Sequence, residues 1–120
     1  MDVSTIQMAK HRKLESLGIE LIDTTVKSGI KAFAPSWEMV LGHKTGKISD
    51  EEYTKQYREM MLRSYMINQT IWFNLLQKEK IALACYCSPD KFCHRHLLVK
   101  YLEGICGVQK IPFRYMGEIG

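Results

Sequence analysis

Residues 81–98 of the 120-residue chain read IALACYCSPDKFCHRHLL, and this stretch decides the fold. Its first five residues are a nearly continuous apolar run directly after the charged residues 78–80. Such a run is typical of a strand that is buried on both faces of a parallel sheet. From residue 92 or 93 to residue 103 we expect a helix with one apolar side, which Gly104 ends. The stretch therefore predicts a buried strand, a loop and a helix in succession.

Strands and helices are also expected to alternate along the rest of the chain. The helix start at Ser49 is the clearest, because Glu52 three residues later completes a capping box. The other expected elements are a short strand near 3–6, helix 8–17 ending at Gly18, strand 18–23, a helical turn at 37–41, helices 49–67 and 68–76, and a last strand at 111–115. This alternation predicts a compact, Rossmann-like, three-layer α/β domain in which helices flank a mainly parallel sheet.

Composition and charge are those of one globular domain, which we expect to span residues 1–120. Hydrophobic residues make up 46% of the chain and charged residues 25%, far from the composition of a disordered protein. No apolar stretch is long enough to cross a membrane, and the first residues lack the apolar core of a secretory signal. We therefore expect a cytoplasmic protein without membrane contact.

The four cysteines lie at 85, 87, 93 and 106, all in the last third of the chain. Disulfides among them would leave the first two thirds without crosslinks, unlike a secreted disulfide scaffold. We therefore expect reduced thiols or metal ligands.

The loop between Cys87 and Cys93 is the segment most suited to chemistry. In open α/β sheets, ligands gather outside the carboxyl ends of the strands, and this loop follows a predicted strand. Free amides at the helix start, together with His94 and Arg95, would stabilise a Cys93 thiolate or hold a phosphate. We therefore expect Cys93, His94 and Arg95 to be catalytic, Cys87 to line the strand end, and Cys85 to be a core residue.

Zinc binding is the less favoured interpretation of the same segment. Cys85, Cys87, Cys93 and His94 together offer four ligands that suit zinc. Structural zinc sites usually take paired cysteines two to four residues apart on a knuckle, and a Cys-x-Cys pair on a strand is less suited to chelation. We expect no cofactor and no metal ligand.

Several motifs resemble those of one family. Residues 82–87 and 92–98, with a Cys-His-Arg triplet after an apolar strand, resemble the signature of the family called "domain of unknown function 488". Residues 22–25 with Lys27, residues 33–37, and the helix that carries Tyr53 and Tyr57 resemble its phage-associated branch. The resemblance spans residues 19–103 and implies a Rossmann-like fold and a role in nucleotide or nucleic-acid processing.

The chain departs from that family at two places. Commoner members carry Asp-Val-Arg after the first strand, where this chain has Asp23-Thr24-Thr25, so Lys27 would have to replace a phosphate-binding arginine. An acidic residue that often precedes the final triplet is replaced by the Cys-Tyr-Cys of residues 85–87, so no acid/base role carries over to it.

Other residues are candidates for ligand binding at the same edge of the sheet. Thr24, Thr25 and Lys27 follow a predicted strand, and hydroxyls with an ammonium group suit a phosphate or ribose, although a solvated loop explains them equally well. Trp37 would stack on a base or, as we favour, belong to the core. Tyr53 and Tyr57 share a helix face; packing against the sheet is favoured over contact with a polar ligand.

Three functions follow from these residues. The leading one is a domain that processes a nucleotide, nucleoside or nucleic acid, with Cys93 as nucleophile or anchor, His94 exchanging protons, and Arg95 and Lys27 holding phosphate. The first alternative is a non-catalytic binder that sequesters a nucleotide-derived signal, as a phage anti-defence protein in the host cytoplasm would. The second is a zinc-stabilised interaction module. The sequence leaves assembly into a homo-oligomer open.

Overall fold

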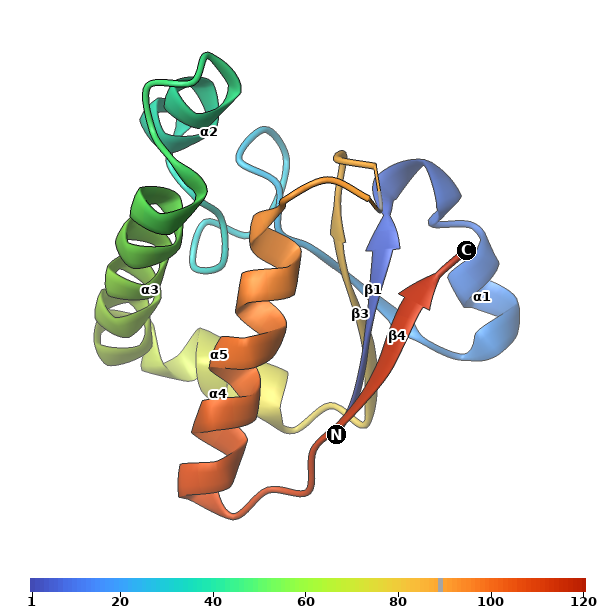
Figure 1. The fold of residues 1–120 in the computed structure, drawn as a ribbon. Helices are drawn as coiled ribbons and strands as arrows, with labels where there is room; N and C mark the ends of the chain where they lie inside the picture. The colour runs from blue at the N-terminus through green and yellow to red at the C-terminus, as the bar shows by residue number, and fades with distance from the viewer. Residues whose placement is uncertain (89) are drawn as a thin grey trace.

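Four parallel strands form the centre of the computed structural model, which describes residues 1–88 and 90–120 (Figure 1). The elements in chain order are β1 (Asp2–Gln7), the 3₁₀ turn η1 (Met8–Lys10), α1 (Lys13–Leu17), β2 (Glu20–Asp23), α2 (Trp37–Lys44), α3 (Asp50–Ile67), α4 (Gln69–Leu76), β3 (Lys80–Cys85), α5 (His94–Gln109) and β4 (Arg114–Ile119). The expected α/β architecture with a parallel sheet is confirmed.

The strand order is β2-β3-β1-β4, and every pair of neighbours runs parallel. Right-handed crossovers that run in opposite directions along a sheet place their helices on opposite faces. Figure 1 shows this arrangement, with α1 on one face and α3, α4 and α5 on the other. The connection after β1 covers one face of the sheet and the connection after β3 covers the other, so the carboxyl ends of these strands are where an open α/β sheet forms its ligand crevice.

The alternation of side chains along β3 builds both sides of the core. Ile81 and Leu83 belong to the large cluster under α3, α4 and α5, whereas Ala82 and Ala84 pack with Leu14 of α1. These four side chains are fully buried. The apolar run at residues 81–85 was therefore predicted correctly as a strand covered on both faces.

The helix boundaries follow local capping chemistry at some ends only. Ser49 accepts a hydrogen bond from the Glu52 amide at 3.1 Å, and Gly18 adopts the left-handed conformation expected after α1. The expected end of α5 at Gly104 is wrong, because the helix continues to Gln109 and buries Ile105 and Cys106 beyond the glycine.

Two other segments differ from the expected boundaries. The expected helix over residues 8–17 is divided into η1 and the short α1. The last strand begins at Arg114 rather than at residue 111, since Pro112 has no amide to donate to a ladder. Of the helices in the described part of the chain, none combines the length and the hydropathy that a membrane crossing requires.

Candidate functional site

A cavity of about 640 Å³ opens at the carboxyl ends of β2 and β3. Its walls come from the loop after β2, the end of α2, the start of α3 and the loop between β3 and α5. The lining residues are Thr25, Val26, Pro35, Val40, His43, Lys44, Tyr53, Cys85, Tyr86, Cys87, Lys91, Phe92, Cys93 and His94. Its volume lies within the range of pockets that enclose small ligands and cofactors.

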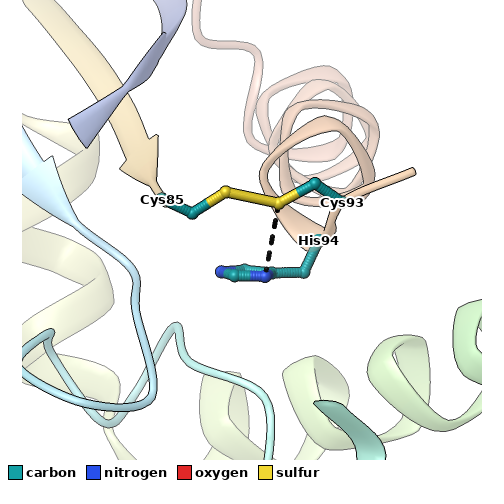
Figure 2. A group of neighbouring side chains, drawn as sticks. All are labelled: Cys85, Cys93 and His94. Atoms are coloured by element: carbon teal, nitrogen blue, oxygen red, sulfur yellow. Dashed lines mark hydrogen bonds between the residues drawn. A yellow bond between two sulfur atoms is a disulfide. The ribbon is translucent and has the colours of Figure 1, made fainter. Parts of the chain in front are cut away.

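Cys85, Cys93 and His94 form a buried cluster at the base of this cavity (Figure 2). Cys85 ends β3 and Cys93 is the N-cap of α5, so the strand end and the helix start direct both sulfur atoms to the same point. The two cysteines form a disulfide in this structure. The expectation of reduced thiols is therefore wrong for this pair, whereas Cys87 and Cys106 are free.

The hydrogen bonds of His94 fix the position of its proton. Its Nε2 lies 2.8 Å from the backbone carbonyl of Thr24, and a carbonyl only accepts, so Nε2 carries the hydrogen. Nδ1 then presents a lone pair, 3.7 Å from the Cys93 sulfur. Burial lowers the pKa of His94 to about 4, so the ring is neutral near pH 7. With a free thiol at Cys93, this nitrogen would be placed to accept the thiol proton.

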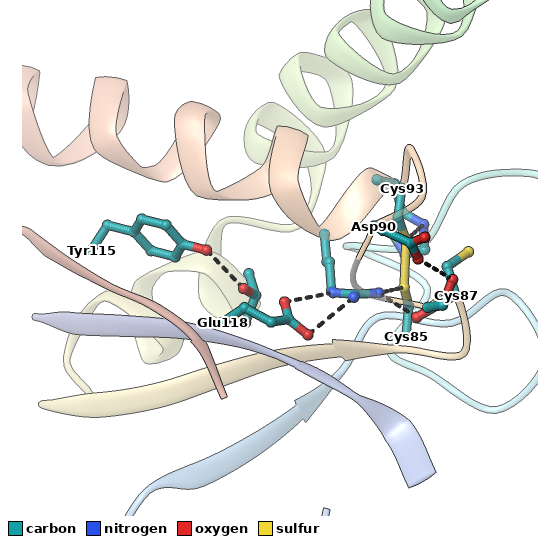
Figure 3. A network of polar contacts seen from close by, with 10 residues as sticks. Cys85, Cys87, Asp90, Cys93, Tyr115 and Glu118 are labelled. Carbon is teal, nitrogen blue, oxygen red and sulfur yellow. Dashed lines mark hydrogen bonds and ion pairs between the residues drawn. A yellow bond between two sulfur atoms is a disulfide. The ribbon is translucent and has the colours of Figure 1, made fainter. Parts of the chain in front are cut away.

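Arg95 is not among the described residues that line the cavity; its partners Cys85, Cys87 and Glu118 are labelled in Figure 3. Its side chain is fully buried and pairs with both carboxylate oxygens of Glu118 in β4, at 3.1 and 3.3 Å. The remaining contacts of the guanidinium are the Cys85 sulfur at 2.7 Å and the Cys87 carbonyl at 3.0 Å. The expected phosphate contact of Arg95 does not fit this arrangement, because the sheet already supplies its counter-charge. Arg95 instead donates a hydrogen bond to the sulfur of Cys85.

Thr24 and Thr25 use their hydroxyl groups inside the protein. Thr24 donates to the Ala84 carbonyl at 2.8 Å and faces Nε2 of His94, so it positions the imidazole. Thr25 donates to an Asp23 carboxylate oxygen at 2.7 Å and lines the cavity. Both side chains are buried. They therefore shape the site more than they offer free groups to a ligand.

The loop after β2 folds back so tightly that Gly29 has no room for a side chain. A Cβ at this position would lie 2.5 Å from the backbone nitrogen and oxygen of Thr25 and 2.6 Å from the Asp23 oxygen. We expect Gly29→Ala to destabilise the protein by about 1–3 kcal/mol, as overpacking does. Urea unfolding followed by circular dichroism measures the change.

Gly104→Ala is the matched control for that prediction. A Cβ at Gly104 meets nothing within 4 Å in the middle of α5, so alanine is expected to stabilise the helix by about 0.5–1 kcal/mol. Equal effects of the two substitutions would contradict the tight loop.

Only some of the other expected ligand-binding residues line the cavity. Cys87 is exposed and lines the cavity. Tyr53 also lines it but is buried, and this burial raises the pKa of its hydroxyl. Tyr57 is buried and donates to the Phe33 carbonyl at 2.7 Å, so the packing interpretation describes it better. Lys27 is exposed and is not among the residues that line the cavity. Trp37 is 52% exposed at the start of α2, so its expected place in the core is wrong.

Apart from Tyr53, which was expected at the site, sequence reasoning missed the aromatic and basic groups of the cavity wall. The rings of His43, Tyr53 and Phe92 meet with centroids 5.0 to 5.4 Å apart. Lys44 and Lys91 line the same cavity. Lys91 and Phe92 lie in the loop between Cys87 and Cys93. Because this loop was already expected to follow a strand end, its position could have identified both residues as part of the site. His43 and Lys44 come from α2, about forty residues earlier, and no local pattern links them to the loop.

A comparison with protein-family models identifies relatives of the chain. The model described as DUF488-N3a, the active DUF488-N3 subclade, matches residues 7–105. Neither the curated proteins nor the solved structures contain a match. The matched segment includes β2, β3, most of α5 and every residue that lines the cavity. Since it covers most of the chain, this protein belongs to the DUF488 family.

Proposed function

We propose that this domain binds a nucleotide, nucleoside or nucleic-acid phosphate in the strand-end cavity and processes it at the cluster of Cys85, Cys93 and His94. One observation carries the proposal: basic and aromatic side chains surround a cavity whose base holds a buried thiol–imidazole cluster. The rings of His43, Tyr53 and Phe92 provide surfaces on which a base can stack.

The charges at the cavity favour an anionic ligand. Lys44 and Lys91 are both in the lining, and no Asp or Glu is among the described residues that form it. An ammonium group acts on a phosphate as a point charge, and such charge-assisted contacts are about twice as strong as neutral ones. Lys44 and Lys91 thus replace Arg95 and Lys27 as the phosphate contacts of the proposal.

The proposal includes a cellular setting. The thiols of the cluster are chemically competent when reduced, and thiols stay reduced in the cytosol. We therefore propose a cytoplasmic protein. A phage origin and an anti-defence role would make its ligand a nucleotide-derived signal of the host.

We expect the reduced protein to bind AMP, and the double substitution Lys44→Ala/Lys91→Ala to weaken this binding about tenfold or more, since each charge-assisted contact contributes about 1.5–3 kcal/mol. Isothermal titration calorimetry with AMP, the other common ribonucleoside monophosphates and their nucleosides measures the affinities. Lys55→Ala, an exposed lysine of α3 outside the cavity, is the control and should leave them unchanged.

Two results would overturn the proposal. One is the absence of binding for every nucleotide tested and for a short oligonucleotide. The other is an affinity that depends on Lys55 as strongly as on the cavity lysines. Mass spectrometry of small molecules released from the purified, denatured protein would identify the natural ligand directly.

A further inference from the structure

We propose that Cys85, Cys93 and His94, once the disulfide is reduced, form a binding site for a zinc-class divalent cation with its open position toward the cavity. One donor atom from each residue lies within 4.8 Å of the other two, and all three side chains are buried. Two thiolates and one imidazole are a ligand set that zinc takes in catalytic sites. The site lacks Cys87, so the Cys-x-Cys spacing that disfavours chelation does not apply to it.

The separation of one sulfur and one nitrogen donor fits tetrahedral coordination. Zn–S and Zn–N distances of about 2.3 and 2.0–2.1 Å place a sulfur and a nitrogen ligand about 3.6 Å apart. The Cys93 sulfur and Nδ1 of His94 are 3.7 Å apart. The Cα atoms of Cys85 and Cys93 are 7.9 Å apart, beyond the usual 4.4–6.8 Å of a disulfide, so this backbone suits two sulfurs that share an ion.

Two ligands already have the outer contacts that metal sites use. A metal-binding histidine usually donates its other N–H to a carbonyl or carboxylate, and His94 donates from Nε2 to the Thr24 carbonyl. Nδ1 is thereby left unprotonated and faces the cysteines. Arg95 donates to the Cys85 sulfur at 2.7 Å, and a positive donor at this place stabilises a thiolate. With Zn²⁺, two thiolates and the Arg95–Glu118 pair, the formal charges of the site sum to zero.

All three ligands line the cavity, so a bound ion would have its fourth position open on that side. Catalytic zinc sites keep such a position for water or a substrate oxygen, and the ion makes a bound water a hydroxide donor near neutral pH. This last step rests on the proposed function, because the hydroxide would attack a nucleotide phosphate or a carbon next to it.

Loading the ion requires reduction first. An added dithiol reduces the Cys85–Cys93 bond. It supplies two electrons and two protons to the two sulfur atoms and is itself oxidised to a disulfide. Zn²⁺ then replaces the proton on each thiol, and both protons pass to solvent. The disulfide and the ion therefore exclude one another.

The test is a titration of the full chain, reduced with a phosphine and freed of metal, with Zn²⁺ against a chromophoric chelator. We expect one ion per chain, and at least about 100-fold weaker binding after Cys85→Ser, Cys93→Ser or His94→Gln, more than the 10–100-fold typical of outer contacts. Cys87→Ser, which removes a free thiol that is not among the three proposed ligands, should leave the affinity for Zn²⁺ unchanged. Protein oxidised to the disulfide should bind no ion.

A second measurement does not depend on how the variants fold. X-ray absorption of the zinc-loaded wild-type protein should give two sulfur ligands and two nitrogen or oxygen ligands. Absence of one-to-one binding, or a coordination shell with any other sulfur count, overturns the metal site. AMP binding by the metal-free protein is measured separately, so a protein that binds zinc but no nucleotide refutes the proposed function and leaves the metal site standing.

Discussion

Glu118→Ala should destabilise the protein by about 3–5 kcal/mol, the cost of leaving one member of a buried ion pair without its partner. The Arg95 side chain has no exposed surface, whereas that of Glu118 is 20% exposed. Removal of the carboxylate therefore leaves the buried Arg95 charge without a partner and without contact with water. Arg95 would keep its contacts with the Cys85 sulfur and the Cys87 carbonyl, neither of which carries a compensating charge when the disulfide is present. Chemical denaturation in urea measures the loss.

Two further variants separate charge from packing in that result. Arg95→Met/Glu118→Ala removes both charges and should recover part of the stability that Glu118→Ala loses. Asp2→Ala breaks the exposed pair between Asp2 and Arg114, which joins β1 to the start of β4, and should have little effect. Similar losses for Asp2→Ala and Glu118→Ala would show that the Arg95 charge is solvated after all.

Trp72→Ala is the second substitution with a large expected effect, about 3–5 kcal/mol of lost stability. Trp72 has no exposed surface, and its ring contacts Phe33, Tyr65 and Tyr101 at centroid distances of 4.8 to 5.8 Å. Its indole N–H donates to the Ser64 hydroxyl at 3.0 Å, so alanine would leave a void and remove this hydrogen bond, although Ser64 would still accept from Asn68.

Phe73→Ala is the matched control for this second prediction. Phe73 is the next residue of α4, is 62% exposed, and should change the stability by less than about 0.5 kcal/mol. Thermal unfolding of both variants by differential scanning calorimetry gives the comparison. An effect of Phe73→Ala as large as that of Trp72→Ala would mean that the two faces of α4 are equally buried.

The parts of the fold that the sequence predicts well are those where local chemistry and burial agree. The run at residues 81–85 is apolar at every position, and Ser49 and Gly18 have the conformations that their residue types favour. The strand expected near residues 3–6, which is part of β1, has a weaker local signal, because Ser4 and Thr5 are polar and yet fully or almost fully buried in a central strand. Its role depends on β3 and β4, which follow far along the chain.

The glycines and the site show where local reasoning fails. Gly104 is a natural helix end, yet burial of Ile105 and Cys106 outweighs its cost of about 1 kcal/mol. The helix ends instead at Gln109, and its C-cap Lys110 takes the left-handed conformation without being a glycine. Cys93 and His94 were located from their own segment. The partner of Arg95 is 23 residues later, in β4, so a pattern of neighbouring basic residues gave no sign that its charge was already matched.

The final strand has a bearing on how far the chain can be shortened. The family match spans residues 7–105 and contains the whole cavity, which makes it an attractive choice for a minimal fragment. Such a fragment would lack β4 and nearly all of β1, the strand that pairs with both β3 and β4. It would also leave Arg95 without Glu118 beneath the cysteines. The family match therefore marks the extent of the site, whereas a fragment that folds must also contain all of β1 and β4.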